Sequence, residues 1–170
     1  MRAQAEQLTR RQSKQRARGF SLIELLIVVG IILVIAAIAI PNYIRTKMRA
    51  NEASAVENLR TITTAQVVYS TTYGIGFSPD LISLAGEPVT PDPTQAGLID
   101  AVLASGTKSG YTYTYNVVTT DPAGNVTDFS VNADPVIAGT SGDRHFYTDQ
   151  SSIIRQKIGA AAGPGDPGLQ

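Results

Sequence analysis

The sequence predicts an α+β fold in which a long N-terminal helix, membrane-spanning in its first half and amphipathic in its second, packs on a small C-terminal antiparallel β-sheet. Three observations support this prediction. The twenty-one residues from Phe20 to Ile40 are apolar except for Ser21 and Glu24. Residues 42–72 contain no glycine or proline, and their apolar side chains recur every three or four positions. From Gly110 onward the period changes to two, which is typical of strands.

The apolar run is long enough to cross a membrane. At about 1.5 Å per residue, a helix over this run would measure roughly 31 Å, close to the thickness of the hydrocarbon layer. Residues 1–19 hold six Lys or Arg against one Glu, a net charge of +5, whereas residues 20–170 hold eight against thirteen acidic residues, a net charge of −5. By the positive-inside rule, residues 1–19 form a cytoplasmic leader and the C-terminal domain lies on the far side.

Glu24 is unusual in such a run, because a carboxylate near the centre of a bilayer costs about 2.5 kcal/mol or more. The stretch Gly19-Phe20-Ser21-Leu22-Ile23-Glu24-Leu25 follows basic residues and begins an apolar run that ends at Pro41. In this it resembles the class III signal sequence of type IV pilins and of the related type II secretion pseudopilins. The resemblance implies cleavage by a prepilin peptidase between Gly19 and Phe20, followed by N-methylation of Phe20.

The resemblance covers residues 18–72 and implies roles for further positions. Glu24 would meet the methylated Phe20 amine of a neighbouring subunit, and the helix would unwind between Gly30 and Pro41 during assembly. Proline at position 41 also predicts a bend, because it removes one backbone hydrogen bond and crowds the preceding turn.

The function implied is a structural subunit of a type IV pilus filament, without catalysis or a required cofactor. Its partners would be further copies of itself, the prepilin peptidase/methyltransferase, an inner-membrane assembly platform and the membrane. No nucleic-acid partner is expected, because residues 20–170 are net acidic. The protein would reside in the bacterial inner membrane as a precursor and then in an extracellular filament. Two alternatives are a type II secretion pseudopilin and a monomeric signal-anchored extracytoplasmic binding domain.

A secretory signal peptide is a further reading of the N-terminus, because Ala37-Ile38-Ala39 offers an A-x-A cleavage pattern. It would release a soluble protein that begins at Ile40. Glu24 argues against it, since a carboxylate is unfavourable within the apolar part of a signal peptide. N-terminal sequencing separates the two readings, because the pilin reading requires methyl-Phe20.

The chain divides into a leader (1–19), a transmembrane and assembly helix (20–41), an amphipathic helix (42–73), a connecting loop with short helices and an antiparallel sheet (74–158), and a tail (159–170). Short helices are expected at 78–86 and 92–106, the second burying Leu98, Ile99, Val102 and Leu103. Tyr111, Tyr113 and Tyr115 lie on one face of a strand that pairs with 127–133, and a second pair is expected at 144–148 and 152–155. The tail is rich in Gly and Pro and is expected to be disordered.

No catalytic constellation is present in the sequence. The single histidine, His145, is expected to be a strand residue with a satisfied ring, and the chain has no cysteine. Asp128, Asp143 and Asp149 are weak calcium candidates, because calcium requires clustered oxygen ligands.

Overall fold

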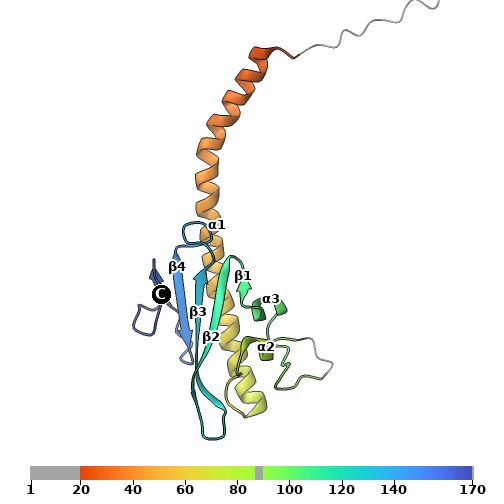
Figure 1. Ribbon diagram of the computed structural model, residues 1–170, viewed down its shortest axis with the longest axis vertical. Helices are drawn as coiled ribbons and strands as arrows, with labels where there is room; N and C mark the ends of the chain where they lie inside the picture. The colour runs from red at the N-terminus through yellow and green to blue at the C-terminus, as the bar shows by residue number, and fades with distance from the viewer. Residues whose placement is uncertain (1–19, 87–89, 170) are drawn as a thin grey trace, which may run out of the picture. The chain divides into compact units, whose positions relative to one another are not determined.

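Helix α1 (Leu22–Tyr73) is the first element of the computed structural model and contains Pro41 (Figure 1). The structure describes residues 20–86 and 90–169, so the predicted leader and Gly19 lie outside the described residues. The chain forms two compact units divided between Ile40 and Pro41, and each is described by itself. The interval from Gly30 to Pro41 is helical here. Its unwinding in a filament and the bend at Pro41 stay predictions.

Two short helices connect α1 to the sheet. Helix α2 (Leu81–Leu84) begins at Asp80, whose Oδ1 accepts a hydrogen bond of 2.7 Å from the Ser83 amide. Helix α3 (Ala101–Ala104) is capped in the same way by Asp100. It is shorter than the sequence predicts, because residues 92–95 form a separate turn around the Asp92 carboxylate. The predicted burial of Val102 is wrong, since its side chain is 58% exposed.

The sheet has five antiparallel strands in the order β1-β2-β3-β4-β5. The strands are β1 (Thr107–Lys108), β2 (Tyr111–Thr120), β3 (Val126–Pro135), β4 (Arg144–Asp149) and β5 (Arg155–Ile158). The predicted hairpin is confirmed as β2 and β3. Its turn forms because the Asp121 carboxylate accepts 2.8 Å hydrogen bonds from the Ala123 and Asn125 amides. Strand β5 begins later than predicted, because residues 149–152 form a turn with Ser152 at a φ of 60°.

The sheet packs on one face of α1, as the two periodicities predict. The buried side chains of the helix are Ala55, Asn58, Leu59, Ile62, Thr63, Ala65, Gln66 and Tyr69. They meet a sheet face that includes Tyr111, Tyr113, Phe129, Val131 and Phe146. Within this interface Asn58 Nδ2 donates a 2.8 Å hydrogen bond to the Tyr113 hydroxyl, and burial raises the pKa of Tyr113. This buried hydrogen bond therefore helps to set how the helix is positioned on the sheet, together with the apolar contacts.

Residues 159–169 are folded against the sheet, which differs from the disordered tail that the sequence predicts. Ala162 is buried, and its carbonyl accepts a 2.9 Å hydrogen bond from Asn132 Nδ2. The Leu169 amide donates a 2.7 Å hydrogen bond to the Ile154 carbonyl. Glycine and proline in this segment therefore make turns that return the chain to β5, and composition alone could not reveal these partners.

Candidate functional site

The described part of the N-terminal unit presents an exposed apolar surface. Every residue from Phe20 to Ile44 is exposed except Ala36, which is intermediate. Phe20 is 72% exposed and Leu22 is 82% exposed. Among the residues that the structure describes, α1 is the one helix long and apolar enough, by length and composition, to cross a membrane. A continuous apolar surface of this size marks a contact with lipid or with other protein chains.

Glu24 is the one charged side chain between Phe20 and Ile44. It lies in the first turn of α1, where a carboxylate interacts favourably with the exposed amides and the dipole of the helix. Phe20 lies two residues before the first residue of the helix and four residues before Glu24, a separation of about one helical turn. The structure thus places the predicted processing residue and the predicted assembly carboxylate at the same end of the apolar surface.

Gly30 is the only glycine in α1. A β-carbon added there would meet no heavy atom of the described chain within 4 Å, so no internal contact requires glycine at this position. Small residues on apolar helices allow another backbone to approach closely. The role of Gly30 in assembly stays a prediction.

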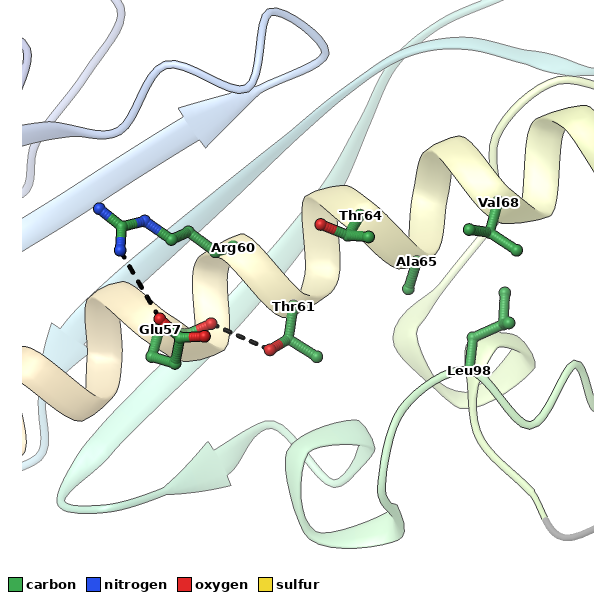
Figure 2. A pocket seen from close by; sticks show the side chains of 7 residues that line it. All are labelled: Glu57, Arg60, Thr61, Thr64, Ala65, Val68 and Leu98. Atoms are coloured by element: carbon green, nitrogen blue, oxygen red, sulfur yellow. Dashed lines mark hydrogen bonds and ion pairs between the residues drawn. The ribbon is translucent and has the colours of Figure 1, made fainter.

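The globular unit also leaves one side of α1 uncovered. Figure 2 shows a shallow groove on that side, of about 270 Å³, with Leu98 of the connecting loop at its edge. Its floor is formed by Thr61, Thr64, Ala65 and Val68. Its two charged residues, Glu57 and Arg60, pair with each other at 3.6 Å. The Thr61 hydroxyl in this groove donates a 3.0 Å hydrogen bond to the backbone carbonyl of Glu57 and not to its carboxylate.

The weak calcium candidates lie apart in the sheet and its loops. Asp128 contacts the hydroxyls of Thr119 and Thr127, and Asp149 accepts a 2.9 Å hydrogen bond from the Ser151 amide. Asp143 is exposed before β4. Within residues 20–86 and 90–169, no three His, Cys, Asp or Glu side chains form a group that could hold a metal.

His145 is a residue of β4, as predicted, and its ring has a partner. His145 Nδ1 lies 2.5 Å from Asp134 Oδ1 of β3. This pair could not be predicted from the sequence, because it depends on the register between β3 and β4. This contact gives the imidazole ring a hydrogen-bond partner within the sheet.

The sequence also gives no sign of a cluster of cations on the globular unit. Arg45 and Arg49 of α1 and Arg144 of β4 line one groove of about 430 Å³. From the sequence, Arg45 and Arg49 are only charges that follow the apolar run. The hairpin register is needed to bring Arg144 beside them.

Comparison with known proteins points to one family. The model of the prokaryotic N-terminal methylation motif matches residues 14–40. The type IV major pilin protein PilA of Myxococcus xanthus is 55% identical over 51 residues, which are 30% of this chain and 23% of that protein. The type IV wide pilus major component PilA4 of Thermus thermophilus is 42% identical over 55 residues, which are 32% of this chain and 42% of that protein. The chain thus spans less than half the length of these two relatives.

A third relative is matched well beyond the N-terminal helix. A fimbrial protein of Pseudomonas aeruginosa is 35% identical over 109 residues, which cover 55% of this chain and 71% of that protein. No solved structure matches the chain significantly. The methylation motif, the long apolar helix that continues into an α+β domain and the match to most of a fimbrial protein agree with one another. The chain belongs to the type IV pilin family.

Proposed function

We propose that the protein is a structural subunit of a type IV pilus, cut between Gly19 and Phe20, N-methylated at Phe20, and polymerised through residues 20–41 into an extracellular filament. The observation that carries the proposal is the exposed apolar surface of residues 20–40, which holds a single charge near its beginning. The motif match to residues 14–40 includes both sides of the proposed cleavage site. Two of the relatives are named as major components of pili, which are structural proteins.

Packing and polar pairing would drive assembly. Lipid is already apolar, so transfer of residues 20–40 from lipid into a helical bundle gains little from hydrophobicity alone. A neighbouring Phe20 amine would supply the counter-charge of Glu24. At a separation of about 4 Å and an effective dielectric constant near 20, such a pair is attractive by about 4 kcal/mol. This pairing would also set the axial offset between adjacent subunits.

Replacement of Glu24 tests the assembly role. Glu24→Ala should leave cleavage and methylation intact, as seen in the mass of the N-terminal peptide, while sheared surface filaments decrease at least tenfold. Glu57→Ala is the matched control, because Glu57 is an exposed glutamate in the globular part of the same helix. Normal filament yield from Glu24→Ala would refute the role of this carboxylate.

The N-terminus and the filament together test the function as a whole. The mature protein should begin with methyl-Phe20, and electron microscopy with an antibody against this chain should show it along the length of surface fibres. A mature start at Ile40 would contradict the proposal at the processing step. Correct processing without surface fibres would favour the type II secretion pseudopilin, or a monomeric anchor if the protein also fails to cross-link to itself.

A further inference from the structure

We propose that the globular units contact one another head to tail through opposite charges, a basic end on one subunit meeting an acidic end on the next. The proposal rests on the filament function proposed above and names a surface by which subunits recognise each other outside the apolar segments. The basic end is defined as Arg45, Lys47, Arg49 and Arg144. The acidic end is defined as Asp80, Asp92, Asp121 and Asp128.

Three cations of the basic end share one surface, which is built from two elements, and Lys47 lies between two of them in the sequence of α1. Arg45, Arg49 and Arg144 line the same groove, together with Glu52 and Asp143. Glu52 holds Arg144 in place, because its carboxylate lies 3.5 Å from Arg144 Nε and accepts hydrogen bonds from the Asp143 and Arg144 amides.

Its other cations are free of internal partners. Within the described part of the chain, no carboxylate lies within 4 Å of the charged groups of Arg45, Lys47 or Arg49. All three side chains are exposed. Four cations against two carboxylates leave this end positive.

The acidic end lies where α1 finishes and the β2–β3 hairpin turns, and Figure 1 shows these two segments at the same end of the globular unit. A 2.8 Å hydrogen bond from the Phe77 amide to the Val126 carbonyl joins them. The sequence has no Lys or Arg between Thr61 and Thr107 or between Ser109 and Asp143, so no cation from these segments offsets the four aspartates.

Two of these aspartates are held firmly in the ionised form. A hydrogen bond from the Thr94 hydroxyl lowers the pKa of Asp92, and one from the Asn125 side chain lowers the pKa of Asp121. The acidic end therefore stays negative at neutral pH and below.

The two ends are far apart within one subunit, so they cannot neutralise each other. Twenty-four residues of α1 separate Arg49 from Tyr73, which is about 36 Å at 1.5 Å per residue. Screening at physiological ionic strength removes interactions beyond roughly 8 Å between exposed charges. Neither end is neutralised by the other, so each is available to an opposite charge on another molecule.

A second copy of the chain is the occupant that fits this arrangement. A contact between two different surfaces of the same protein is heterologous, and it generates an open helical array when the rotation does not close. The opposite charges lie at the two ends of the globular unit. In an end-to-end contact they favour subunits that point in the same direction, since two like ends would meet if one subunit were reversed. The charge pattern thus specifies the direction in which neighbouring subunits point. Within residues 20–40, Glu24 is the one charge that could do the same.

Charge reversal with compensation tests the proposal in the full-length protein. Arg45→Glu with Arg49→Glu should lower the yield of sheared filaments about tenfold, because like charges then face each other. Thr72→Lys with Ala123→Lys should do the same from the acidic end. Both of these positions are exposed and make no side-chain hydrogen bond with the described residues. The four substitutions combined should restore the yield to within about twofold of the wild type.

Controls separate this proposal from folding and from the filament function. Val102→Lys with Thr107→Lys adds the same two charges at exposed positions on the α3–β1 segment and should leave the yield unchanged. Immunoblots must show equal amounts of cleaved protein in every variant. Wild-type cells without filaments would overturn the filament function itself. Two results would overturn only the head-to-tail contact. The first is an unchanged filament yield in Arg45→Glu with Arg49→Glu, and the second is a loss of yield in that variant that Thr72→Lys with Ala123→Lys does not repair. The second result would point to anionic lipid headgroups as the partner of the basic end.

Discussion

Tyr113→Phe tests whether the buried hydrogen bond between the helix and the sheet stabilises the globular unit. Tyr113 is 4% exposed and Asn58 is 7% exposed, and Asn58 Nδ2 donates to the Tyr113 hydroxyl at 2.8 Å. Removal of the hydroxyl leaves the amide donor buried without this acceptor, at a cost of about 1–3 kcal/mol. For a domain of this size, that cost lowers the melting temperature by about 5–15 °C.

A double-mutant cycle isolates the contribution of this pair. Asn58→Leu alone should also destabilise the protein, because the Tyr113 hydroxyl then loses its partner. Asn58→Leu with Tyr113→Phe should cost less than the sum of the two single changes by about 0.5–3 kcal/mol, since neither buried polar atom remains. Near-ultraviolet circular dichroism of the detergent-solubilised protein during heating gives the four melting temperatures. Tyr43→Phe makes the same chemical change at a side chain that is 68% exposed and should shift the melting temperature by less than about 2 °C. If the losses of stability in the two single variants simply add up in the double variant, the hydrogen bond between Asn58 and Tyr113 does not stabilise the fold.

Three further predictions concern the fold of the globular unit. Gly142→Ala should destabilise it by about 1–3 kcal/mol, because the new β-carbon would clash with the hydroxyl of the fully buried Tyr111; an unchanged urea midpoint would contradict this. Deletion of residues 159–170 should lower the melting temperature by about 10 °C or more, whereas a dispensable tail would leave it unchanged. A hydrogen bond from the Lys108 side chain lowers the pKa of Asp100 in the folded protein, so the ionised carboxylate stabilises the fold. This stabilisation is complete above the pKa of Asp in the unfolded chain, near 3.9, and is lost as the pH falls through the lower pKa of the folded state. Melting temperatures measured from pH 7 to pH 2 should therefore fall below about pH 4 and fall less in Asp100→Asn; equal losses would show that the pair contributes nothing.

The N-terminal half of the protein could be understood from its sequence. Length, hydropathy and the charge difference around Phe20 to Ile40 depend only on the order of residues, as does the motif that contains Gly19 and Glu24. The spacing of Leu59, Ile62 and Tyr69 likewise predicts which side of the helix is buried. Local periodicity is enough to predict these features, because a helix forms its backbone hydrogen bonds within itself and its buried side follows one repeating pattern.

The contacts between distant segments were decided by the tertiary structure. Composition predicted disorder for residues 159–170, but the Asn132 side chain and the Ile154 carbonyl bind this segment from elsewhere in the chain. The pairing of His145 with Asp134 and the position of Arg144 beside Arg49 depend on strand register. Register is set by the packing of whole side-chain faces, which no local pattern records. Local patterns therefore predict the apolar helix and the motif at its start. The two charged ends of the globular unit depend on the fold, because their members come from segments far apart in the chain.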